Sequence, residues 1–118
     1  MLTIDEILDD FAVYCGVEFN DRSVNMRSSR GESPLHWMAT LGDHLAVSLL
    51  LKNGANVTVV DINGETPLHF AVRNRHNLTA SVLLQNGACV FQKNMVGLSA
   101  ADLAIADANM PIIALFKT

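Results

Sequence analysis

The four histidines are the residues of this chain whose type most directly suggests chemistry, because imidazole binds metal ions and transfers protons near neutral pH. His36 and His69 lie 33 residues apart, and His44 and His76 follow them by eight and seven residues. No two of them have the i, i+4 spacing that places a pair of zinc ligands on one helix face, and no cluster of cysteines or carboxylates completes a site. The spacing therefore argues against a metal centre.

The two cysteines, Cys15 and Cys89, are the candidate nucleophiles, but neither stands in a recognisable catalytic motif. Cys15 falls on the apolar face of a predicted N-terminal helix, and Cys89 follows the turn-forming pair Gly87-Ala88. We predict that both are small buried hydrophobic residues. The catalytic alternative is a metal- or thiol-dependent enzyme that uses His36, His69 and Cys89. A metal analysis of the purified protein would distinguish it from a protein without a catalytic site, because bound zinc or iron near one equivalent would support the enzyme.

The charge of the chain restricts its partners. The 118 residues are 50% hydrophobic and carry a net charge of −4, which argues against nucleic acid or an anionic membrane as the main partner. Residues 1–21 hold six acidic and no basic side chains, whereas residues 22–118 hold six acidic and eight basic ones. The acidic segment is interpreted either as a solvated helix face or as a surface for a basic partner, and Arg22, Arg27 and Arg30 follow it.

The first residues, MLTIDEILDD, lack the basic and apolar regions of a signal peptide. No apolar run reaches the roughly 18 residues that a membrane-spanning helix needs. We therefore predict a cytoplasmic location and no membrane partner. Two lone cysteines agree with a reducing compartment.

An internal repeat of 33 residues organises the chain. Residues 31–63 and 64–96 share 13 identities in 33 pairs, where chance would give about two or three. The identical pairs include Gly31/Gly64, Glu32/Glu65, Pro34/Pro67, Leu35/Leu68, His36/His69, Leu50/Leu83, Asn53/Asn86 and Gly54/Gly87. A motif that recurs at a fixed interval is typical of stacked structural units.

Each unit predicts two short helices. Ser33 or Thr66 is suited to cap the first helix, and the following proline fits its first position. Gly42-Asp43 ends this helix and caps a second one, whose apolar stripe runs over residues 45–51 until Asn53-Gly54 ends it. Residues 55–63 form an extended, turn-rich link. In the second unit Arg75 replaces the glycine, so we expect His76 or Asn77 to provide the cap.

Both ends depart from the repeat. Residues 97–118 begin a third copy that we predict to be a C-terminal capping repeat. Residues 1–30 are predicted to form an N-terminal capping helix and a degenerate half repeat, with a capping box over residues 3–6 and Leu2 placed to pack on Ile7. The chain is therefore predicted to be a single domain, 1–118, with repeats at 31–63 and 64–96.

The motif Gly-x-Thr-Pro-Leu-His at a 33-residue period, followed by Leu-Leu-x-x-Gly-Ala, resembles the ankyrin repeat. The resemblance covers about residues 22–118. It implies an all-α solenoid of stacked helix-turn-helix units with β-hairpin-like tips at residues 27–30, 60–63 and 93–96. It also implies that the motif histidine is structural and hydrogen-bonds near the base of the hairpin. Members of this family bind other proteins, so no catalysis, cofactor or small-molecule substrate is expected.

The resemblance further implies that partners bind at the tips and at the exposed face of each first helix. Carried over to this sequence, the partner-binding positions are Arg27, Arg30, Glu32, Leu41, Val60, Ile62, Asn63, Glu65, Arg73, Asn74, Lys93, Met95, Val96 and Leu98. Ser28 stands where the family favours a tip aspartate. The second and third tips are unusually apolar, which indicates either a partner-binding ridge or tips that pack on one another. Trp37 is interpreted as a core residue rather than an anchor for a partner.

We predict a non-catalytic protein–protein interaction module, and favour an inhibitor or a toxin-neutralising immunity protein. The alternative is a scaffold or assembly-factor subunit of a larger complex. A fragment of a longer array is a further alternative, although the capping box and the divergent third unit favour finished ends.

Overall fold

The structure is a computed structural model that describes residues 3–16 and 23–116. In these ranges it contains seven helices and no strand: α1 (Ile4–Cys15), α2 (Pro34–Leu41), α3 (His44–Lys52), α4 (Pro67–Arg73), α5 (Asn77–Gln85), α6 (Ala100–Ala106) and α7 (Met110–Phe116). None of these helices has the length and apolar character that a bilayer crossing needs. The all-α prediction is confirmed, whereas the β-hairpin-like character of the tips stays a prediction. Leu2 and Arg22 lie outside the described residues.

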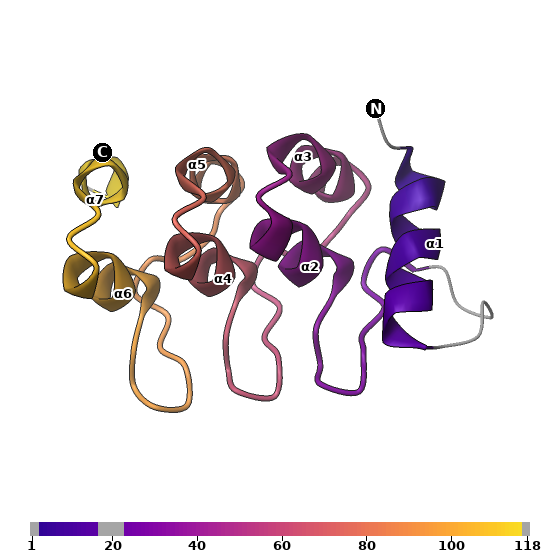
Figure 1. Ribbon diagram of the computed structural model, residues 1–118, viewed down its shortest axis with the longest axis horizontal. Coiled ribbons are helices and arrows are strands. Elements are labelled where there is room, and N and C mark those ends of the chain that lie inside the picture. The colour runs from indigo at the N-terminus through magenta and orange to yellow at the C-terminus, as the bar shows by residue number, and fades with distance from the viewer. Residues whose placement is uncertain (1–2, 17–22, 117–118) are drawn as a thin grey trace.

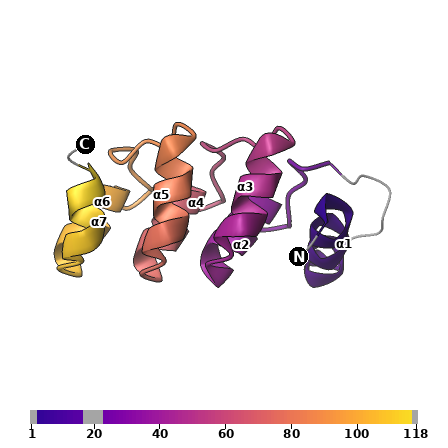
Figure 2. The same cartoon turned by 90° about the horizontal axis from the view of Figure 1, so that it is seen from above.

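The helices form pairs that stack along the longest axis of the molecule, 41 Å in extent (Figure 1). Within each pair, two or three residues join the first helix (α2, α4 or α6) to the second (α3, α5 or α7). The first helices make one layer and the second helices another, and the loops between pairs all project from the layer of first helices (Figures 1 and 2). At the N-terminal end of this solenoid, α1 packs against α2 and α3.

Each first helix begins at the capping residue that the repeat predicted. The hydroxyls of Ser33, Thr66 and Ser99 accept a hydrogen bond from the backbone N–H of the third helical residue, whose side chain bonds back to the capping residue. Pro34 and Pro67 occupy the first helical position, where a missing N–H has no intrahelical partner to lose. Each cap stabilises its helix by about 1 kcal/mol, so the start of every unit is fixed locally.

The second helices start in two different ways. Asp43 caps α3 as predicted, since its carboxylate accepts the backbone N–H of Ala46 at 3.0 Å. His76 holds the capping position of α5, but its side chain makes no capping hydrogen bond. Its Nε2 donates instead to the carbonyl oxygen of Thr40 in the preceding unit, at 3.0 Å. Our expectation of a capping side chain there was wrong for His76, because this contact between units holds the ring elsewhere.

The apolar core runs through the stack between the two helix layers. Leu35 and Leu68 lie at equivalent places in the first two units, as do Leu50 and Leu83, and all four are fully buried. Burying a leucine side chain contributes about 1.5–3 kcal/mol, so each pair of helices is held mainly by residues that recur every 33 positions.

Aromatic side chains attach α1 to the first unit. Phe11 is fully buried, and the half-buried Trp37 of α2 stacks on Tyr14 with ring centroids 5.4 Å apart and lies 5.8 Å from the ring of Phe11. Trp37 therefore packs between helices, as expected of a core residue at the edge. Cys15 is half-buried rather than fully buried, because it is the last residue of α1. Burial raises the pKa of the Cys15 thiol, which makes it less reactive.

Candidate functional site

The two recurring histidines are fully buried at the start of α2 and α4. The Nδ1 atom of His36 accepts the backbone N–H of Ser33 at 3.1 Å, so its Nε2 carries the hydrogen and donates to the carbonyl oxygen of Glu65 at 2.7 Å. His69 repeats this arrangement and donates to the carbonyl oxygen of Leu98 at 3.0 Å. Burial lowers the pKa of the His36 imidazole, which favours its neutral form. Each ring thus ties a helix to the following loop, which confirms the structural role.

The other side chains that could take part in catalysis or metal binding do not lie close together among the described residues. Cys89 is exposed, so the prediction that it is buried was wrong. It lies in the loop after α5, at the position that the exposed Asn56 occupies one unit earlier. Among the residues that the structure describes, no group of three or more His, Cys, Asp or Glu side chains could hold a metal ion. The catalytic alternative gains no support from these side chains.

The loops that project from the stack are closed by the same turn in each unit. The side-chain oxygens of Ser28, Asp61 and Asn94 each accept the backbone N–H groups two and four residues later, at distances between 2.9 and 3.2 Å. Ser28 therefore performs the same task as the aspartate it replaces. These turns give the tips (27–30, 60–63 and 93–96) a fixed shape before any partner arrives.

Backbone hydrogen bonds join neighbouring tips into one row. The N–H of Ile62 donates to the carbonyl oxygen of Arg30 at 3.0 Å, and the N–H of Met95 donates to that of Asn63 at 2.9 Å. The guanidinium of Arg27 adds a further link, since its Nε donates to the carbonyl oxygen of Gly31 at 3.0 Å and a terminal nitrogen donates to that of Val60. The tips form a connected surface rather than three separate loops.

Large apolar side chains project from the second and third tips and beside them. Ile62, Phe91, Met95, Val96 and Leu98 are all exposed, and Met95 reaches 76% exposure. The alternative in which the tips bury these side chains against one another does not hold for them. An exposed apolar cluster with polar neighbours is typical of a surface that binds another protein.

An ion pair between Arg73 and Glu65 lies at the base of the tips. Arg73 of α4 makes two hydrogen bonds to the carboxylate of Glu65, and the amide of Asn94 donates to the same carboxylate at 3.0 Å. The hydrogen bonds from Arg73 lower the pKa of Glu65, and burial opposes them only in part. Glu65 is only 7% exposed, so this residue holds the third tip against α4 and is not itself open to a partner.

The predicted binding positions differ in how accessible they are. Most are exposed: Arg27, Arg30, Leu41, Ile62, Asn63, Arg73, Asn74, Lys93, Met95, Val96 and Leu98. Glu32 and Val60 are half-buried, and Glu65 is buried. The tips and the ends of α2 and α4 therefore contribute the open part of the predicted set.

Two polar pairs between units were not anticipated. The side-chain amides of Asn77 and Asn109 bond to each other at 2.8 and 3.3 Å, and Asn109 is fully buried. Arg75 donates to the carboxylate of Asp107 at 2.7 Å. Both pairs join residues 32 positions apart, so the repeat period was the signal that could have found them.

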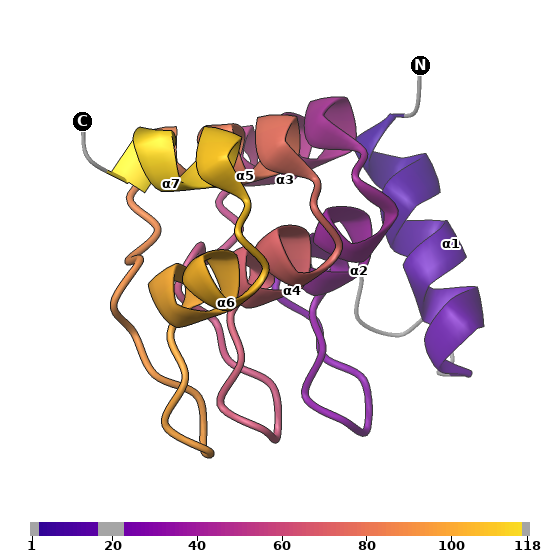
Figure 3. The ribbon, with the colours of Figure 1, turned by 60° about the vertical axis from the view of Figure 1, so that its left-hand side comes forward.

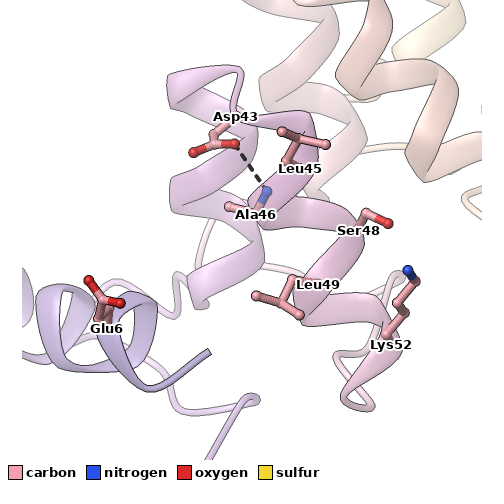
Figure 4. Close-up of a pocket in the computed structure, with 7 residues that line it drawn as sticks. All are labelled: Glu6, Asp43, Leu45, Ala46, Ser48, Leu49 and Lys52. Carbon is pink, nitrogen blue, oxygen red and sulfur yellow. Dashed lines mark hydrogen bonds between the residues drawn. The ribbon is translucent and has the colours of Figure 1, made fainter. Parts of the chain in front are cut away.

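A groove of about 540 Å³ lies between α1 and α3, in the layer of second helices and away from the tips (Figure 4). It is lined by Glu6, Asp43, Leu45, Ala46, Ser48, Leu49 and Lys52. The lining contains no histidine or cysteine, and Asp43 is engaged in the cap of α3. The tip surface is therefore the stronger candidate site.

Comparison with known proteins agrees with this geometry. A family model described as ankyrin repeats (3 copies) matches residues 5–94. The match runs from the first turn of α1 to the start of the third tip, and thus contains two complete helix pairs. No curated protein shows a significant match to the chain.

Proposed function

The chain belongs to the ankyrin-repeat family, whose repeats are protein–protein interaction modules, and we propose that it binds a partner protein through its tips and first-helix face. The exposed apolar side chains on the second and third tips carry this proposal. Exposure of Ile62, Met95 and Val96 to water is unfavourable, because their side chains are apolar. A partner that covers them removes this apolar surface from solvent, which lowers the free energy. No enzymatic step is part of the proposal.

The surroundings of these side chains fit a protein partner. Arg30, Asn63 and Lys93 are exposed beside the apolar residues, which matches the polar rim around an apolar centre that is typical of protein interfaces. Hydrogen bonds between the tips hold the row in place before binding. A surface that is already ordered loses less conformational freedom when a partner docks, so affinity improves.

Within this proposal, the chain acts as an inhibitor or as a toxin-neutralising immunity protein. The described residues form α1, the helix pairs and the loops between them, and masking a partner requires no more than such a binding surface. We take residues 1–118 as one domain that masks its partner by covering it. A scaffold or assembly-factor subunit is the alternative, and it would leave the activity of the partner unchanged.

The experiment is affinity capture at physiological salt with the purified chain as bait, followed by mass spectrometry. We expect one stoichiometric protein. Adding the chain to that protein then separates the two roles, because an inhibitor abolishes its activity at one equivalent and a scaffold does not. Repeated capture of no protein would count against both.

A double variant tests the site itself. Ile62→Asp combined with Met95→Asp should abolish capture, yet change the free energy of unfolding by no more than about 1 kcal/mol, because both side chains are exposed. The matched control is Leu78→Asp, which changes a similarly exposed side chain on α5, outside the tips. Loss of capture in the control, or retention in the double variant, would contradict the site.

A further inference from the structure

The row of tips carries exposed positive charges. Arg30 and Lys93 are exposed, and neither side chain forms an ion pair with a carboxylate among the described residues. Arg27 is exposed as well, and the hydrogen bonds of its guanidinium go to the backbone carbonyl oxygens of Gly31 and Val60. Because these carbonyl groups are neutral, all three positive charges remain without a paired carboxylate in the described part of the chain.

The tips bury the one carboxylate that their sequence contains. Asp61 is only 8% exposed, and its carboxylate accepts the backbone N–H groups of Asn63 and Glu65, both at 2.9 Å. At the equivalent positions of the first and third tips, the neutral side chains of Ser28 and Asn94 close the same turn. The three tips therefore expose positive charges and almost no negative charge.

Two carboxylates lie beside the tips in sequence, and neither pairs with a tip cation. Glu32 follows the first tip but is half-buried. Asp102 is exposed in the first turn of α6, where its carboxylate accepts the backbone N–H of Ser99 at 2.9 Å. That hydrogen bond and, to a smaller extent, the charge of Lys93 lower the pKa of Asp102. Since the two side chains form no ion pair, the ammonium of Lys93 stays available to a carboxylate of a partner.

Apolar side chains lie between the cations of the row. Backbone hydrogen bonds set Ile62 against Arg30 and Met95 against Asn63, so the three tips lie side by side in chain order (Figure 3). Arg30 belongs to the first tip and Lys93 to the third, while the exposed side chains of Ile62 and Met95 belong to the second and third. The row thus combines an apolar centre with a positive charge toward each end.

The first helix carries the opposite charge. α1 contains four carboxylate side chains, of which Asp5, Glu6 and Asp10 are exposed, and no basic residue. It packs at the N-terminal end of the stack, whereas the tips project from the layer of first helices (Figure 1). An acidic partner is therefore repelled by α1 and attracted by the tips, which orients it as it approaches.

We propose that the partner surface which covers the tips is acidic around an apolar centre, a statement that rests on the proposed function. Carboxylates of the partner lie opposite Arg30 and Lys93, and its apolar side chains lie opposite Ile62 and Met95. A basic or neutral partner would remove the two cations from water without providing counter-charges, which is unfavourable. Carboxylates provide these counter-charges and also raise the rate of association.

An acidic protein surface fits the row better than a nucleic acid or an anionic membrane does. The chain has a net charge of −4, so a polyanion that extends beyond the tips is repelled by the rest of the molecule. The negative groups of a protein partner are confined to a patch. Such a partner also supplies apolar side chains that cover Ile62 and Met95.

The test selects peptides from a random-peptide library displayed on phage, with the immobilised full chain as bait. We expect the wild type to enrich peptides that combine aspartate or glutamate with apolar residues. The double charge reversal Arg30→Glu with Lys93→Glu should enrich basic peptides instead. Lys52→Glu is the control, because Lys52 is exposed on α3 outside the tips, so this variant should enrich the same acidic peptides as the wild type.

The dissociation constant of the best wild-type peptide, measured by fluorescence anisotropy, gives the size of the effect. Arg30→Glu and Lys93→Glu should each weaken binding about fivefold, because each exchanges an attraction for a repulsion. Lys52→Glu should weaken it less than about twofold, because salt screens distant charges. Far-UV circular dichroism checks that each variant is folded. If the double reversal does not fold, Arg30→Gln with Lys93→Gln takes its place and should lose the acidic preference.

Binding to the variant Ile62→Asp with Met95→Asp separates failure of this inference from failure of the proposed function. Peptides that lose binding to this variant occupy the tips. Tip-dependent peptides without an excess of acidic residues, or an unchanged preference after charge reversal, would overturn the acidic partner and leave the tips as a binding site. If no selected peptide depends on the tips, both proposals fail. Wild-type binding to vesicles of phosphatidylserine and phosphatidylcholine at physiological salt, abolished by the double reversal, would make the row a membrane-binding surface and also overturn the acidic partner.

Discussion

Replacing His36 by leucine removes a set of hydrogen bonds while nearly keeping the volume of the side chain. In the native structure the ring accepts the N–H of Ser33 and donates to the carbonyl oxygen of Glu65, both of which are buried. His69→Leu makes the same change one unit later, but there the acceptor is the carbonyl oxygen of Leu98, an exposed residue. The two variants therefore differ in how many backbone groups are left without a partner.

The expected losses follow from this difference. A buried polar group that loses its partner costs about 1–3 kcal/mol. His36→Leu leaves two such groups, so we expect a loss of about 3 kcal/mol in the free energy of unfolding. In His69→Leu, water can reach the carbonyl of Leu98, and we expect a loss of about 2 kcal/mol. His44 is half-buried and its ring makes no hydrogen bond within the described residues, so His44→Leu should stay within about 0.5 kcal/mol of the wild type.

Urea unfolding followed by far-UV circular dichroism measures these losses, provided that the slope of the transition is the same in all variants. The expected order of stability is wild type and His44→Leu, then His69→Leu, then His36→Leu. Equal losses in the three variants, or a smaller loss in His36→Leu than in His44→Leu, would refute the assigned roles.

Three further predictions concern stability. Since folding lowers the pKa of His36, the unfolded chain binds more protons near pH 6, so stability present above about pH 6.5 is lost as the pH falls. Urea midpoints at about pH 7.5 and about pH 5.5 should therefore differ more in the wild type than in His36→Leu. Gly42→Ala should lose about 2–3 kcal/mol, because φ is +73° and the added Cβ would lie 2.5 Å from the ring of His76. The control Gly54→Ala has a positive φ but open space around it, and should lose only about 1 kcal/mol in the same titration. Thr79→Val should gain about 1 kcal/mol, because the buried hydroxyl of Thr79 has no hydrogen-bond partner among the residues that the structure describes; a lower thermal midpoint would show that this hydroxyl is satisfied.

The starts of the first helices were predictable because they depend on residues close in sequence. A hydroxyl residue before a proline fixes the start of α2 and α4, and Gly42 ends α2 in the left-handed conformation that glycine tolerates best. The same local information failed at α5. There Arg75 adopts a positive φ of 59° in place of the glycine, and His76 bonds to the preceding unit, a contact that is not visible within one repeat.

The candidate site was predictable in outline only. The period of 33 placed the tips, and their composition indicated apolar side chains such as Met95 there, but only the structure shows that these side chains are exposed. The burial of Glu65 depends on Arg73 and Asn94, which lie 8 and 29 residues away, so it could not be deduced from the motif alone. The exposure of Cys89 could have been predicted by aligning the two repeats, since the equivalent residue in the first repeat, Asn56, is polar.

Amide hydrogen–deuterium exchange, with and without the captured partner, tests the binding surface most directly. Residues 60–63 and 93–98 should exchange more slowly in the complex, because the partner covers the second and third tips. If slower exchange were confined to residues 44–52 and 77–85 in the second helices while the tips stayed unchanged, the partner would bind the opposite side of the stack and our account of the site would be contradicted.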